Sequence, residues 1–172
     1  KISYGTVSGL KVASAGVYIE NIHFVNNNMR NAYIVTGALF SFTGCLFEHT
    51  LTSPYGNLGV ESAILNYFDP VGNSRNHFLA PSGAAGSLVY MNAASGGFYR
   101  STLNGGGGGG SRPHGLVLSG NAATYTYLLI IKNCNNGMRA QIGGQIEHDT
   151  TTFSGNTIDK NAVAASYGWI SA

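Results

Sequence analysis

The sequence contains few charged residues. Asp, Glu, Lys and Arg make up 9% of its 172 residues, whereas an average soluble domain has about 25%. Nine basic and seven acidic residues give a net charge of +2, and no cluster of Lys and Arg occurs. Proteins that bind nucleic acid usually carry a basic patch or stripe. We therefore expect no nucleic acid among the partners of this protein.

Long apolar runs and cysteines are also scarce. The longest apolar run, residues 127–131, has the length of a strand, far short of the roughly 18 residues of a membrane span. Membrane insertion is therefore not expected. The two cysteines, Cys45 and Cys134, are expected at equivalent places of a repeat and several coils apart. This predicts two buried free thiols rather than a disulfide.

Glycine and asparagine take the place of the missing charges. Hydrophobic residues make up 44% of the chain and there are 25 glycines, a composition that argues against disorder. Gly and Asn tolerate the positive φ angles of tight corners, so the composition predicts many short strands joined by turns. We expect Asn26, Asn27 and Asn28 to form one such turn, with side chains that stack on those of neighbouring turns.

A repeat of about 22–23 residues organises these strands, and a fixed period of this size is typical of a solenoid. Ile19 aligns with Phe42, and the following residues align in step. Near the other end of the chain, Ile131 aligns with Phe153 at a similar offset. Apolar residues alternate along each run, as expected for strands with one buried face. About 23 residues at 3.3 Å each trace a loop of roughly 70 Å, enough for three short strands and their corners.

The fold class predicted is all-β, a right-handed parallel β-helix forming a single domain over residues 1–172. Inward residues should then stack in columns. One column would hold Ile19, Phe42, Ile131 and Phe153, and the second column is expected to contain Ile22, Cys45 and Cys134. An α-solenoid is excluded by the frequent Gly and Asn, and the Leu-x-x-Leu-x-Leu pattern of leucine-rich repeats is absent.

Three segments depart from this pattern. Residues 51–81 contain prolines and glycines that interrupt the repeat. We therefore expect longer side loops there, on one face of the solenoid that is often its ligand-binding face. Residues 105–110 are six consecutive glycines, which predicts either a native loop or an engineered linker. The sequence opens in mid-pattern at Lys1, and we expect the chain to be a segment of a longer protein.

The stretches GVYIENIHFVNN, GALFSFTGCLFEHT and TTFSGNTIDKN resemble coils of the pectin-lyase-like β-helix superfamily, and within it those of phage tailspikes and tail fibres. The resemblance covers roughly two thirds of the chain and specifies fold better than function. It implies a homotrimeric structural and receptor-binding segment, located in the virion tail or outside the cell, that engages host surface polysaccharide. The alternative it implies is a polysaccharide-degrading hydrolase or lyase.

The alternative requires catalytic carboxylates, of which glycoside hydrolysis uses two. Glu61 and Asp69 form the most suggestive pair because they lie in the irregular segment. Tyr55, Tyr67 and His77 are close in sequence and would contact sugar rings. The competing interpretation is that Asp69 starts a turn before Pro70 and that Glu61 is a solvated flank of a strand. Under the spike hypothesis neither residue is catalytic.

Other chemistries find little support in the sequence. The triplet Glu147-His148-Asp149 suggests a metal site, but adjacent strand residues face opposite ways, so only Glu147 and Asp149 can share a face. No second His stands at metal-ligand spacing, and no Asp-rich cluster accompanies the arginines, as calcium-dependent lyases of this fold would require. Phosphate-binding and dinucleotide-binding motifs are missing. We therefore expect no metal and no cofactor.

Overall fold

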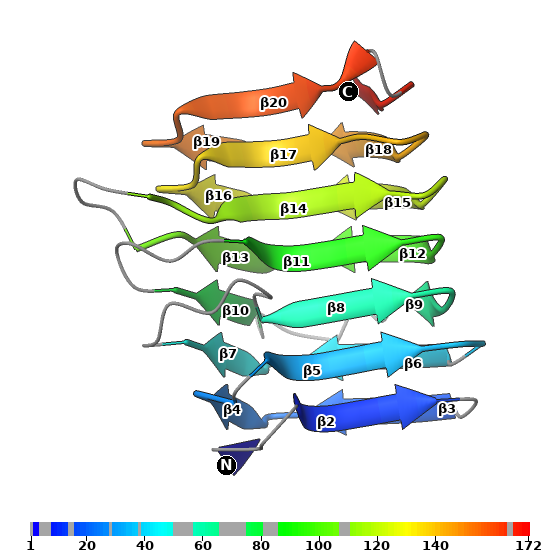
Figure 1. Cartoon of the computed structure of the whole chain (residues 1–172). Helices are drawn as coiled ribbons and strands as arrows, with labels where there is room; N and C mark the ends of the chain where they lie inside the picture. Colours follow the sequence, from blue (N-terminus) through cyan, green and yellow to red (C-terminus); the bar gives the residue numbers. More distant parts are fainter. Residues whose placement is uncertain are drawn as a thin grey trace.

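The computed structural model describes residues 2–3, 8–13, 16–27, 29–37, 39–49, 57–65, 75–80, 86–106, 111–164 and 167–172. Within these ranges the chain forms three parallel sheets of seven strands each, stacked as successive coils of a β-helix (Figure 1). The predicted solenoid is therefore confirmed. No helix among the described residues is long and apolar enough to cross a membrane.

The three sheets are named A, B and C here. Sheet A contains β1 (Ile2–Ser3), β4 (His23–Val25), β7 (Leu46–Glu48), β10 (Asn76–Leu79), β13 (Ser101–Asn104), β16 (Ile130–Lys132) and β19 (Thr152–Ser154). Sheet B contains β2 (Ser8–Ala13), β5 (Arg30–Val35), β8 (Leu58–Glu61), β11 (Ser87–Asn92), β14 (His114–Ser119), β17 (Asn136–Ala140) and β20 (Ile158–Ala162). Sheet C contains β3 (Gly16–Glu20), β6 (Leu39–Thr43), β9 (Ile64–Leu65), β12 (Ser95–Tyr99), β15 (Ala123–Tyr127), β18 (Gln145–Asp149) and β21 (Trp169–Ser171).

Coil length varies along the helix. Ile19 pairs with Phe42, and Ile131 pairs with Phe153, as predicted. Phe47, however, pairs with Phe78, so the coil between them is longer than either of these two. The strands before and after this coil keep their buried inward positions, and the phase of the repeat changes between them.

For this reason the predicted columns were right between neighbouring coils but wrong across the longer ones. Ile131 and Phe153 lie in sheet A, whereas Ile19 and Phe42 lie in sheet C. The two cysteines are likewise not equivalent: Cys45 precedes β7 at the C-to-A corner, and Cys134 follows β16 at the A-to-B corner. Both thiols are free and buried, as predicted.

A stack of phenylalanines fills the lower core. The rings of Phe24 and Phe47 are parallel with centroids 4.9 Å apart, and those of Phe47 and Phe78 are 4.5 Å apart. Phe42 meets Phe24 and Phe47 edge-on from sheet C. Like residues stack because the parallel register repeats the same inward position in each coil. These side chains hold sheets A and C at a fixed separation.

A ladder of asparagine side chains provides hydrogen-bond partners for polar groups at the corner between sheets A and B. Asn27, Asn31 and Asn57 are each 0% exposed. The Asn27 side chain donates to Asn31 Oδ1 at 2.7 Å, and Asn31 Nδ2 donates to Asn57 Oδ1, also at 2.7 Å. Asn57 in turn donates to the Leu79 carbonyl at 3.0 Å. Asn27 thus bonds within its own corner, and Asn31 makes the link to the next coil. The predicted stacking of Asn26, Asn27 and Asn28 on neighbouring turns stays a prediction.

Candidate functional site

The outer face of sheet C carries the chain's most distinctive group of exposed side chains. Along β18 the inward residues Ile146 and His148 are buried, whereas Gln145, Glu147 and Asp149 point to solvent. The parallel register places Tyr125 beside Glu147 and Tyr127 beside Asp149. An aromatic row and an acidic row therefore lie on neighbouring coils.

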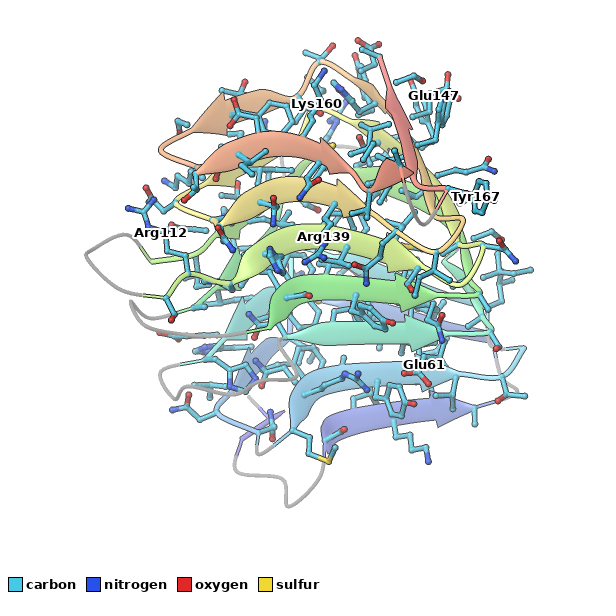
Figure 2. The ribbon with its side chains drawn as sticks, turned by 45° about the horizontal axis from the view of Figure 1, so that its top comes forward. Glu61, Arg112, Arg139, Glu147, Lys160 and Tyr167 are labelled. Atoms are coloured by element: carbon cyan, nitrogen blue, oxygen red, sulfur yellow. The ribbon has the colours of Figure 1, made fainter. Side chains whose placement is uncertain are left out.

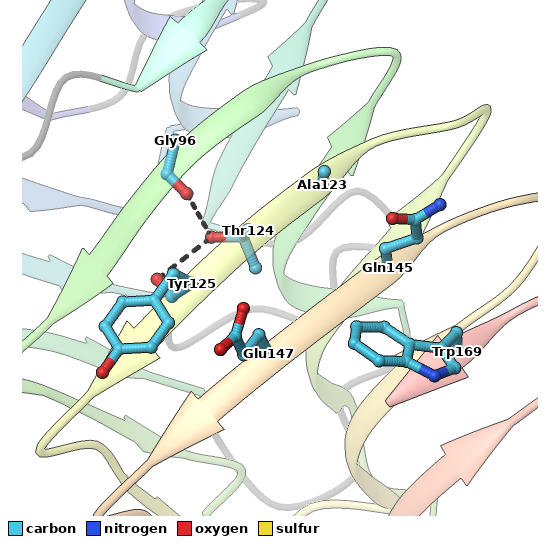
Figure 3. Close-up of a pocket in the computed structure, with 7 residues that line it drawn as sticks. All are labelled: Gly96, Ala123, Thr124, Tyr125, Gln145, Glu147 and Trp169. Carbon is cyan, nitrogen blue, oxygen red and sulfur yellow. Dashed lines mark hydrogen bonds between the residues drawn. The ribbon is translucent and has the colours of Figure 1, made fainter. Parts of the chain in front are cut away.

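This face contains an open groove of about 200 Å³. Its lining is formed by Gly96, Ala123, Thr124, Tyr125, Gln145, Glu147 and Trp169 (Figure 3). In Figure 3 the Glu147 carboxylate lies between the Tyr125 ring and the Trp169 indole. Tyr125 is 36% exposed and Trp169 is 49% exposed. The groove thus offers two accessible aromatic faces with a carboxylate between them.

Two more tyrosines extend the aromatic wall. Tyr99 lies 5.8 Å from Tyr125 and 6.4 Å from Tyr127, measured between ring centroids. The Tyr99 ring occupies the space above Gly97, where an added Cβ would overlap it. Gly97 therefore lets Tyr99 lie flat along the sheet. Desolvation, followed by the charges of Asp149 and Glu147, raises the pKa of Tyr125.

The floor of the groove is fixed by hydrogen bonds. Thr124 points inward and is buried, and its hydroxyl donates to the Gly96 carbonyl at 2.7 Å (Figure 3). Backbone bonds continue this connection, since Gln145 N–H donates to the Ala122 carbonyl and Trp169 N–H donates to the Gly144 carbonyl. The exposed rings and carboxylates therefore project from strands that are hydrogen-bonded to one another.

A second, larger hollow of about 530 Å³ lies at the B-to-C corner. Its lining consists of small or aliphatic residues, with Asn121 as the largest polar group and no titratable side chain. Volume alone does not make a binding site. The groove on sheet C combines aromatic faces with charge, which this hollow lacks.

The structure places Glu61 on the outer face of sheet B. Its Oε2 accepts a hydrogen bond from the Tyr33 hydroxyl at 2.6 Å, and its Oε1 lies 3.8 Å from Arg30 Nη2. The Arg30 guanidinium lies over the Tyr33 ring at 4.6 Å and covers Gly59. These contacts give Glu61 a structural function in linking two coils.

His77 lies elsewhere, on β10 of sheet A, between Leu46 and Thr102 in the register. It is exposed, and desolvation, followed by the charges of Arg75 and Lys132, lowers its pKa. Glu61 and His77 thus belong to different sheets. Asp69, Tyr55 and Tyr67 lie outside the described residues, so the proposed catalytic pair stays a prediction.

Sequence reasoning identified the shared face of Glu147 and Asp149 but missed its aromatic neighbours. The offset between Ile131 and Phe153 was sufficient to identify these neighbours from the sequence. Applied one strand earlier, the same offset places Tyr125 beside Glu147 and Tyr127 beside Asp149. Across the described part of the chain, no group of three or more His, Cys, Asp or Glu is arranged to hold a metal ion.

Comparisons with known proteins leave the family open. No protein-family model, no curated protein and no solved structure matches the chain significantly.

Proposed function

We propose that this chain is a structural and receptor-binding β-helix segment, of the tailspike or tail-fibre kind, that binds polysaccharide in the groove on sheet C. The observation that carries this proposal is the pairing of Tyr125 and Trp169 with Glu147 between them. Sugar rings present apolar faces that pack on aromatic side chains, while their hydroxyls donate hydrogen bonds to carboxylates. The regular spacing of coils suits a ligand that is itself a repeating chain.

Self-association is part of the same proposal. Of the eight large hydrophobic side chains exposed among the described residues, five lie on strands of sheet C. Leu39 and Ile64 are neighbours in the register and are 43% and 52% exposed. Adjacent exposed aliphatic residues of this kind favour a subunit contact. In a homotrimer the patch formed by Leu39 and Ile64 would pack against a second copy and leave the aromatic groove accessible.

A polysaccharide hydrolase is the second candidate. Glu147 and Asp149 lie on one face of β18, separated by a single residue. This spacing corresponds to roughly 7 Å along the strand. Such a distance falls within the range of carboxylate separations in inverting hydrolases. Both side chains are exposed, whereas a catalytic acid is normally held in a desolvated pocket. The groove therefore supports binding better than cleavage.

The test is binding to a panel of purified bacterial surface polysaccharides, measured for the wild type and for the double variant Tyr125→Ala/Trp169→Ala. Losing both stacking surfaces predicts roughly tenfold weaker binding. Tyr18→Ala is the matched control, because Tyr18 is 48% exposed on the same sheet but lies outside the groove. Unchanged affinity in the double variant would refute the assignment.

Two further readouts complete this test. Sedimentation equilibrium at several concentrations should give a trimer mass, and a monomer would contradict the subunit contact at Leu39 and Ile64. Release of reducing ends from any polysaccharide that binds would move the proposal to the hydrolase, provided that Glu147→Gln abolishes the release.

A further inference from the structure

Charge is distributed unevenly over the three sheets. The strands of sheet C contain Glu20, Glu147 and Asp149, and in their described residues no Lys or Arg. The chain as a whole carries a net charge of +2. A face with three carboxylates and no basic residue therefore stands out against a slightly basic molecule.

The basic side chains belong to other parts of the coil. Lys11, Arg30, Arg139 and Lys160 lie on sheet B, Lys132 lies on sheet A, and Arg75, Arg100 and Arg112 lie in connections between strands. Figure 2 shows Arg112 and Arg139 on a different side of the coil from Glu147. Screening limits electrostatic reach to about 8 Å in physiological salt, so most of these cations act on their own faces. Arg75 is an exception, because its guanidinium donates to the Leu128 carbonyl at 3.0 Å, at the corner that follows Tyr127.

Glu61 on sheet B has an ion-pair partner and Glu48 on sheet A lies beside a histidine. Among the described residues, the acidic row of sheet C and Asp159 on sheet B have no such partner. Glu48 lies 3.0 Å from His23 Nε2 on sheet A, and Glu61 lies 3.8 Å from Arg30 on sheet B. Within the described part of the chain, neither Glu147 nor Asp149 has an ion-pair partner. The groove and its edge thus hold carboxylates that are available to a cationic ligand.

We infer that the groove selects glycans that carry protonated amines, namely amino sugars without an N-acetyl group. An ammonium group would pair with Glu147 or Asp149, and its sugar ring would pack on Tyr125 or Trp169. Cations also bind the faces of aromatic rings, so the tyrosine row strengthens the same preference. An acidic polysaccharide would instead place its carboxylates beside Glu147, and such like-charge contacts are unfavourable.

This inference rests on the proposed function, and the choice of ligands separates the two. The probes are the β-1,4-linked hexasaccharides of glucosamine and of N-acetylglucosamine, which differ only in the acetyl groups, together with hexagalacturonate as an acidic chain. Binding is measured by isothermal titration calorimetry at pH 6, once at low and once at high salt concentration.

The glucosamine chain should bind roughly tenfold more tightly than its acetylated counterpart, because two exposed ion pairs contribute about that much. This advantage should shrink at high salt, and hexagalacturonate should bind most weakly. Equal affinity for the two hexasaccharides, or a preference for the acidic chain, would overturn the inference and leave polysaccharide binding intact. Failure of all three probes, together with failure of the polysaccharide panel, would remove both proposals.

The double variant Glu147→Gln/Asp149→Asn keeps side-chain size and removes both charges. It should weaken binding of the glucosamine chain by a larger factor than binding of the acetylated chain, because the Gln and Asn amides still accept hydrogen bonds from sugar hydroxyls but carry no charge. Glu20→Gln is the matched control, since Glu20 is an exposed carboxylate on the same sheet that does not line the groove. If the double variant weakens both hexasaccharides equally, or if Glu20→Gln has the same effect, charge selection at the groove is refuted.

Discussion

Replacing Asn31 with Ala should strongly destabilise the β-helix. Its side chain takes part in four hydrogen bonds. Oδ1 accepts from the backbone and side chain of Asn27 at 3.3 and 2.7 Å, and Nδ2 donates to the Glu48 carbonyl at 3.0 Å and to Asn57 Oδ1 at 2.7 Å. The residue is 0% exposed, so water cannot replace these partners.

The expected magnitude follows from that count. Each buried hydrogen bond contributes about 1 kcal/mol net, and leaving a buried partner unsatisfied costs more, so the Asn31→Ala variant should lose about 4 kcal/mol of unfolding free energy. Since domains are stable by only about 5–15 kcal/mol, a loss of this size would bring the chain close to its unfolding limit at ordinary temperature.

The assay is urea denaturation followed by far-ultraviolet circular dichroism, at a fixed protein concentration because association also shifts stability. Asn161→Ala is the matched control, since the Asn161 side chain donates one bond, to Asn136 Oδ1 at 3.0 Å, and is only partly buried. Its loss should be about 1 kcal/mol. Asn31→Asp keeps the volume but removes both donated bonds, so it should also be strongly destabilising.

Two results would refute this reasoning. If Asn31→Ala cost no more than Asn161→Ala, the buried ladder would contribute little to stability. If Asn31→Asp matched the wild type, loss of volume, rather than loss of hydrogen bonds, would explain the alanine variant.

Two further predictions concern acid stability and the aromatic wall. Burial, reinforced by Lys160 and opposed by Asp149, lowers the pKa of the buried His148. As pH falls, His148 therefore takes up a proton more readily in the unfolded protein than in the folded one. The free energy of unfolding should then fall as pH drops below about 6.5. His148→Leu should reduce that loss in urea midpoints compared at pH 7.5 and 5.0, and an unchanged loss would contradict the assignment. Gly97→Ala should displace the Tyr99 ring and weaken glycan binding several-fold. Gly16→Ala is the control, because Gly16 lies on the same sheet and no atom lies within 4 Å of the added Cβ. Equal affinities of the two variants would show that Tyr99 does not shape the groove.

The sequence allowed the β-helix to be predicted, but not which residues of distant coils occupy equivalent positions. Alternating apolar residues and the repeat offset correctly paired Ile19 with Phe42. The coil between Phe47 and Phe78 is longer than the coils from which the repeat was read. A constant period carried across that coil therefore assigns later residues to the wrong sheet, as happened for Ile131 and Cys134.

Corner conformations show a similar limit. Gly and Asn do occupy positive-φ corners, for example Asn133 at 57° and Gly155 at 63°. Leu128 and Ile142 adopt the same conformation, at 54° and 50°, although their own preferences oppose it. Neighbouring coils impose these corners: Leu128 N–H donates to the Asp149 carbonyl, and the Ile142 carbonyl accepts from Asn121 N–H. Local propensity cannot reveal a conformation set by contacts one coil away.

The groove depends on the same long-range register. In a β-helix each outward column takes one residue from every coil, so neighbours in the site are separated by a full coil in sequence. From Tyr125 to Glu147 the offset equals that from Ile131 to Phe153, and these neighbours therefore follow from the repeat. Trp169 pairs with Gln145 at a longer offset, so the repeat alone would place a different residue there. The aromatic and acidic rows were thus predictable in principle, whereas the indole that closes the groove required the structure.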